Sequence, residues 1–120
     1  MKKFKDWRTD SHERWVDAAN IFGSQLFNSA REEQISNLAE SLTERERTIA
    51  VEAIDNTLYA VLMMLDGVAD LKFDSNHSTE YLLMQRVFND QSKLVSEIEL
   101  APNGDGLCMG FHGWKANEFE

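Results

Sequence analysis

A chain of 120 residues with 42% hydrophobic and 28% charged residues has the size and composition of one globular domain. Its single cysteine excludes a disulfide framework, and its longest apolar run, residues 58–65, is too short to cross a bilayer, which takes about 20 residues. The net charge of −9 disfavours direct contact with a phosphate backbone and favours a basic protein as the partner.

The charge is unevenly distributed along the chain. Four basic residues and one acidic residue give residues 1–8 a charge of +3, which leaves −12 on the other 112 residues. No apolar stretch of about 7–15 residues follows this basic start, so we expect no secretory signal and a cytoplasmic location. Four cations are few for a membrane-surface helix, and we expect no membrane partner. Acidity for solubility alone gives a similar composition, so charge does not identify the partner.

The first part of the chain has apolar residues at roughly helical intervals. They are Phe4, Trp7, Trp15, Ala19, Phe22 and Leu26. This spacing predicts a helix that ends near Asn28, with Phe4 and Trp7 docking its beginning onto the core. Ser29 and Glu32 have the spacing of a capping box. It predicts a new, short amphipathic helix, whose apolar residues are Ile35, Leu38, Ala39 and Leu42.

The strongest helical pattern follows Thr43, which forms a capping-box match with Glu46. One apolar stripe consists of Ala50, Ala53, Ile54, Thr57, Leu58, Val61, Leu62 and Leu65. From Leu58 onward the pattern is apolar almost all round, which predicts that residues 50–65 form the centre of the fold. Asp66 and Gly67 then predict the end of the helix, because glycine suits the left-handed position after the last turn. Asp55 and Asn56 belong either to a buried polar network or to the exposed edge of this helix.

After Gly67, short segments alternate with turn-like clusters, which is typical of an antiparallel meander. The predicted strands cover residues 69–73, 81–88 and 94–100. Residues 79–88 also fit a helical face through Tyr81, Met84 and Phe88, so both alternatives stay open for that segment.

The stretch LAPNGDGLCMGFHGW, residues 100–114, predicts a turn and a return strand. Leu107, Met109 and Phe111 alternate with smaller or polar residues, as in a strand with one buried face. A four-residue loop over residues 102–105 would pair Leu100 with Leu107, which puts the apolar residues of both strands on one face. The predicted architecture is therefore α+β: about three N-terminal helices packed on a C-terminal three- or four-stranded antiparallel meander. We expect a single domain, 1–120, that is helical over about 1–67 and β-rich over about 68–114.

Two groups of residues raise the question of catalysis or metal binding. Cys108 and His112 resemble a thiol–imidazole pair, but the expected hairpin places Glu99 opposite Cys108, and a carboxylate would raise the pKa of the thiol. Asp74, His77 and Glu80 are spaced three residues apart in a polar turn, without a recognised metal-ligand motif. We therefore expect no catalytic residue, no metal and no cofactor.

A candidate partner-binding patch lies in the predicted hairpin, because charges surround an aromatic residue there as in binding hot spots. It comprises Glu97, Glu99, Asp105, His112 and Trp114.

The sequence favours a non-enzymatic acidic binding or inhibitor protein that acts as a monomer or weak dimer. The leading hypothesis is a bacterial immunity protein that neutralises a basic, nuclease-type toxin, since an acidic protein would cover sites that grip phosphates. The alternatives are a small metal- or thiol-dependent enzyme around Cys108 and His112 with His77, a phage-type DNA-mimic inhibitor, and an accessory subunit.

Overall fold

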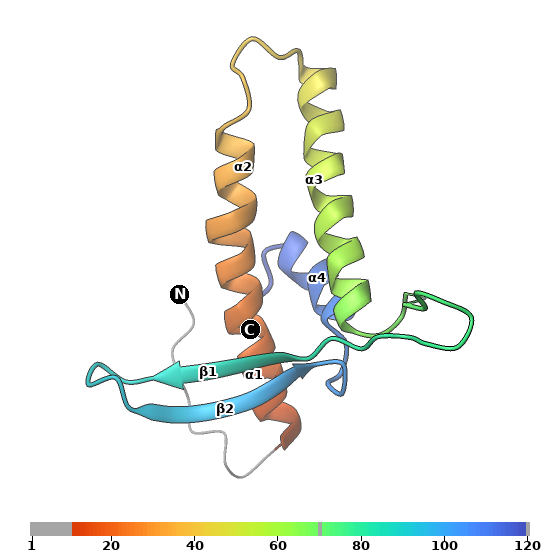
Figure 1. The fold of residues 1–120 in the computed structure, drawn as a ribbon. Helices are drawn as coiled ribbons and strands as arrows, with labels where there is room; N and C mark the ends of the chain where they lie inside the picture. The colour runs from red at the N-terminus through yellow and green to blue at the C-terminus, as the bar shows by residue number, and fades with distance from the viewer. Residues whose placement is uncertain (1–10, 70, 120) are drawn as a thin grey trace.

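The computed structural model of the chain describes residues 11–69 and 71–119. It is a mixed α+β structure (Figure 1). Two helical arms, residues 11–36 and residues 44–65, rise from a β-hairpin, and a short C-terminal helix lies between these arms. In chain order the elements are α1 (Ser11–Gln25), the π-helical η1 (Leu26–Arg31), α2 (Glu32–Ser36), α3 (Glu44–Leu65), β1 (Leu83–Phe88), β2 (Leu94–Ala101) and α4 (Leu107–Lys115). The mixed α+β class agrees with the expectation from the sequence.

The helix that begins at Ser11 continues without a break to Ser36. The predicted stop near Asn28 and the cap at Ser29 are wrong. The backbone stays helical through these residues, and α2 follows Arg31 without a side-chain cap. A π-helical turn occupies this place instead, and its buried Phe27 packs against Phe111 with ring centroids 5.6 Å apart. Tertiary packing therefore holds the segment helical where local signals predict a break. The predicted docking of Phe4 and Trp7 lies outside the described residues.

The second arm begins and ends where the sequence predicts. The Thr43 hydroxyl accepts the Glu46 N–H at 3.1 Å, and the Glu46 carboxylate accepts the Thr43 N–H at 2.9 Å, which confirms the capping box. Asp66 ends α3, and Gly67 follows with φ of +73°, as the left-handed position requires. The short helix before α3 ends at Ser36 rather than at residue 42, because the chain turns there to reach the new cap.

The sheet has two antiparallel strands, β1 and β2, with Arg86 opposite Glu97. The strand alternative for residues 79–88 is thus confirmed from Leu83 onward. The predicted third and fourth strands are not found in the described part of the chain. Before the sheet, a single bridge joins Lys72 to Ser78, because the intervening turn folds back on itself and satisfies its own backbone groups.

Residues 107–115 form the helix α4, so the predicted return strand and its pairing with residues 96–100 are wrong. Leu107, Phe111 and Trp114 are spaced four and three residues apart and are all buried on one face of α4, whereas Met109 is 73% exposed. The Asp66 carboxylate accepts the N–H groups of residues 107 and 108 at 2.9 and 2.8 Å. This distant acceptor caps α4 and replaces the local cap that the sequence lacks.

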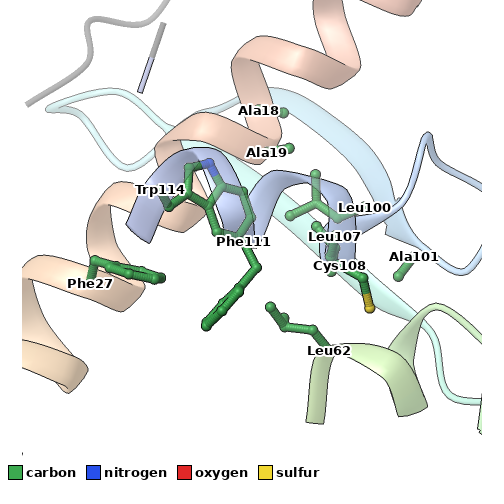
Figure 2. Close-up of a cluster of buried hydrophobic side chains, with 10 residues drawn as sticks. All are labelled: Ala18, Ala19, Phe27, Leu62, Leu100, Ala101, Leu107, Cys108, Phe111 and Trp114. Atoms are coloured by element: carbon green, nitrogen blue, oxygen red, sulfur yellow. The ribbon is translucent and has the colours of Figure 1, made fainter. Parts of the chain in front are cut away.

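The core lies where α1, β2, α4 and the end of α3 meet (Figure 2). Trp114 is 2% exposed, and its indole N–H donates to Asn20 on α1 at 3.0 Å. A Cβ at Gly23 would lie 2.2 Å from the Trp114 ring, so α1 and α4 approach this closely only because residue 23 is glycine. The Trp15 indole likewise donates to the Leu100 carbonyl at 3.0 Å and ties α1 to β2.

The prediction that residues 50–65 form the centre of the fold is wrong. Of the α3 side chains only Asp55 and Leu62 are buried, while Val61 is 48% and Met64 39% exposed. The reason is that α3 packs mainly on α4, which covers one of its faces (Figure 1). By length and composition alone, α3 is also long and apolar enough to cross a membrane, although it contains four acidic residues, Glu44, Glu46, Glu52 and Asp55.

A candidate binding groove between the helical arms

The acidic residues predicted to bind a partner already have structural contacts. Arg86 donates to the Glu97 carboxylate at 2.9 Å across the sheet, and Arg14 donates to the Glu97 carbonyl at 2.8 Å. The Glu99 carboxylate accepts the Asn103 N–H at 2.8 Å in the bend after β2. Both carboxylates therefore stabilise the hairpin and its exit.

The other predicted partner residues do not form one surface with them. Trp114 is buried in the core, so its predicted role as an exposed contact is wrong. His112 is exposed on α4, with its ring 5.5 Å from that of Tyr59 on α3. Asp105 is exposed in the bend between β2 and α4. The strand alternation expected for residues 107–112 does not exist, because these residues form α4, in which successive side chains are rotated by about 100°.

Cys108 is buried at the first turn of α4 and faces the Asp66 carboxylate. Burial, with a smaller contribution from the hydrogen bond and charge of Asp66, raises the pKa of the Cys108 thiol to about 12. The sequence argument expected a raised pKa but attributed it to Glu99. At neutral pH this side chain is a protonated thiol, which is a poor nucleophile and a poor metal ligand.

The turn at residues 74–77 is closed by a local contact between His77 and Asp74 at the surface. The His77 ring nitrogen Nδ1 lies 2.8 Å from the Asp74 carboxylate. A hydrogen bond from the Asn76 backbone, together with the His77 contact, lowers the pKa of Asp74. Within residues 11–69 and 71–119 no group of three or more His, Cys, Asp and Glu side chains is arranged to hold a metal ion.

An ion pair joins the two helical arms. Arg31 at the end of η1 donates through Nε and Nη2 to the two Asp55 oxygens on α3, at 2.6 and 3.2 Å. The Asp55 side chain is only 5% exposed, and Lys115 Nζ on α4 lies 3.8 Å from it. The hydrogen bond to Asp55 raises the pKa of Arg31, whose guanidinium also lies 5.1 Å from the centre of the Phe27 ring.

Sequence reasoning left the role of Asp55 open and missed Arg31. Of the two alternatives for the pair at 55 and 56, Asp55 is in a buried polar network and Asn56 is exposed. A signal for Arg31 exists in the sequence, because it is the only basic residue between Arg14 and Arg45. Which carboxylate it would meet depends on how the arms lie in space.

A groove opens on each side of this ion pair. We call the first the arm groove: it has a volume of about 370 Å³, with Ala30 and Gln34 on one arm and Ala53, Ile54, Thr57 and Leu58 on the other. Its walls are mostly apolar, and Arg31 closes one side. The second groove, of about 390 Å³, is lined largely by charged residues of both signs, including Arg47 and Glu52.

Six exposed carboxylates lie on the loop that connects the arms, residues 37–43, and on the halves of the arms nearest this loop. They are Glu32, Glu33, Glu40, Glu44, Glu46 and Glu52, accompanied by the exposed Arg45 and Arg47. Six acidic and two basic residues give residues 32–52 a charge of −4. Part of the acidity of the chain thus lies at this end of the arms, where Glu44 and Glu52 line the second groove, and the sequence did not point to this place.

The chain matches no protein-family model, no curated protein and no solved structure. Its function must therefore be argued from the arrangement of its own residues.

Proposed function

We propose that this chain is a non-enzymatic binding protein that takes a basic protein partner onto its helical arms. The observation that carries the proposal is a groove with mostly apolar walls between two helical arms, on a part of the chain, residues 32–52, that carries a net charge of −4. Negative charge speeds the approach of a basic partner and orients it, and the apolar walls supply affinity when they leave water.

The state of the best catalytic candidate supports binding over thiol chemistry. A protonated, buried Cys108 with a pKa of about 12 offers no thiolate at neutral pH. His112, the other member of that pair, is exposed and lies against the Tyr59 and Phe111 rings.

Within this class we propose an immunity protein that acts in the cytoplasm against a basic, nuclease-type toxin. A nuclease presents cationic groups to its phosphate substrate. The carboxylates of residues 32–52, a segment of net charge −4, would compete with the substrate for those cationic groups. A DNA-mimic inhibitor follows the same electrostatic logic. It would block many DNA-binding proteins, whereas an immunity protein binds and blocks one.

The test is inhibition and binding with purified basic nucleases at about 50 mM and about 300 mM salt, where screening differs strongly. We expect one nuclease to be bound and blocked at the lower salt, and less so at the higher. The double variant Glu33→Gln/Glu40→Gln should bind more weakly, whereas Asp90→Asn/Glu118→Gln, with the same change of charge away from the arms, should bind as the unaltered chain does. Failure to retain any basic protein at the lower salt would refute the proposal.

A further inference from the structure

We propose that the arm groove binds one amphipathic α-helix of the partner, with an apolar face directed into the groove and lysine or arginine residues along its edges. This inference rests on the proposed function, because it specifies which part of a basic partner is bound. It also assigns the binding site to the arms rather than to the β-hairpin.

The first support is an apolar stripe on α3 that the described residues cover only in part. Ala50, Ile54, Thr57, Val61 and Met64 follow one another at intervals of four and three residues, the spacing of a helix face that packs against another helix. Val61 and Met64 are exposed, and the opposite face of α3 already packs on α4 through Leu62. Within residues 11–69 and 71–119, the end of the stripe at Val61 and Met64 is thus open to a partner.

The second support is the form of the groove. Its walls are two helical segments, η1–α2 and α3, and its lining residues on α3 lie at positions 53, 54, 57 and 58. A third helix laid between two others presents anchors at matching i, i+3, i+4 and i+7 positions. A small polar ligand would need unpaired polar groups in the wall, but the Arg31 guanidinium is already bound to Asp55.

The Arg31–Asp55 pair also keeps the groove open and fixed. The two arms meet at this buried contact, while their tips are joined only through residues 37–43. A groove whose walls are held before binding loses less conformational entropy when the partner helix arrives.

The third support is the charge at the edges of the groove. Glu33 lies one turn after Ala30, and Glu46 lies two turns before Ala53, so helical spacing puts both carboxylates near the faces that line the groove. Glu46 stays ionised near neutral pH, because hydrogen bonds from Thr43 hold its pKa below the usual value. A second copy of this chain would bring the same carboxylates and be repelled, whereas a basic helix would be attracted.

The experiment uses the full chain and a fluorescent peptide of about 18 residues, long enough to form a helix, with leucine and lysine at helical spacing. Binding is followed by anisotropy at about 50 mM salt. Two peptides serve as controls: one with glutamate in place of lysine, and one with the same composition but strictly alternating leucine and lysine. We expect only the helical lysine peptide to bind tightly.

A pair of charge-matched variants locates the site. Ala53→Arg places a long cation in the groove at an exposed helical position, and Gln91→Arg adds the same charge at the tip of the β-hairpin. We expect Ala53→Arg to lower the affinity for the helical lysine peptide at least about tenfold. Gln91→Arg should change this affinity less than about twofold. Circular dichroism of both variants establishes that they are folded.

Each other outcome overturns the inference in a distinct way. If Ala53→Arg and Gln91→Arg lowered the peptide affinity equally, the peptide would not be bound in the arm groove, although binding of a basic partner would still stand. Equal binding of the alternating peptide would remove the requirement for a helix. A dimer in light scattering that Ala53→Arg dissociates would identify a second copy as the occupant. No binding of either lysine peptide would overturn the inference of a bound helix, whereas the proposed function is refuted only if no basic nuclease is bound in the assay above.

Discussion

Replacement of Asp55 by asparagine should lower the free energy of unfolding by about 3 kcal/mol, at the low end of the about 3–5 kcal/mol that removing one partner of a buried ion pair costs. The carboxylate is 5% exposed and accepts two hydrogen bonds from Arg31, whose side chain is 16% exposed. Asparagine preserves the size of the side chain but leaves the guanidinium desolvated without a counter-charge. The one acceptor oxygen that asparagine retains explains why we take the low end of the range.

The assay is thermal and urea unfolding, followed by circular dichroism and tryptophan fluorescence. A loss of about 3 kcal/mol should lower Tm by about 10 °C in a domain of this size. The double variant Arg31→Met/Asp55→Leu should recover most of that loss, because apolar side chains replace both charges and neither is left buried alone. Asn56→Asp, the exposed neighbour, serves as the control and should change stability by less than about 0.5 kcal/mol.

If Asp55→Asn costs less than about 0.5 kcal/mol, the reasoning is refuted. The pair would then behave as a screened surface ion pair, and it would not hold the arms at a fixed separation. The argument for a preformed groove would lose its main physical basis with it.

The remaining predictions concern α4 and its contacts. Gly23→Ala should lower Tm although alanine favours helix, because the new Cβ would lie 2.2 Å from the Trp114 ring and overpacking costs about 1–3 kcal/mol. Asp66→Ala should lower the free energy of unfolding, measured in urea, by about 1–2 kcal/mol, because the N–H groups of Leu107 and Cys108 lose their acceptor. Cys108 should react with a thiol reagent at pH 8 only after unfolding; rapid reaction of the folded chain would contradict its burial. Because folding raises the pKa of this thiol from 9.0 to about 12, its contribution to stability is complete below pH 9 and is lost as the pH rises toward 12, which unfolding measured across that range would detect.

Local signals in the sequence predicted the features that depend on neighbouring residues. The capping box at Thr43 and Glu46 and the stop at Gly67 need only a few adjacent residues, and both were correct. The strand over residues 94–100 was also correct, and Ser96, Ile98 and Leu100 are more buried than Val95 and Glu97, but Leu94 at the start of the predicted buried face is exposed.

The error at α4 has a definite physical cause. Leu107 and Phe111 fit an alternating strand through Met109, and they fit equally a helical face that continues to Trp114. The choice between the two is made by Asp66, a cap 41 positions earlier in the chain, and by contact with α1. Neither interaction can be recognised from residues 100–114 alone.

The error at α3 arose from a different limit. An apolar stripe shows that a helix buries that face against something, but it does not show that the covering element belongs to the same chain. The same limit applies to the binding site. Glu97 and Glu99 looked free in sequence, yet the structure gives both of them partners in or next to the hairpin.

The most direct test of the central claim is amide NMR of the full chain titrated with the helical leucine–lysine peptide. The account predicts chemical-shift changes concentrated in residues 30–34 and 50–64, with β1 and β2 little affected. Changes concentrated in residues 83–101 instead would contradict it and return the binding site to the hairpin.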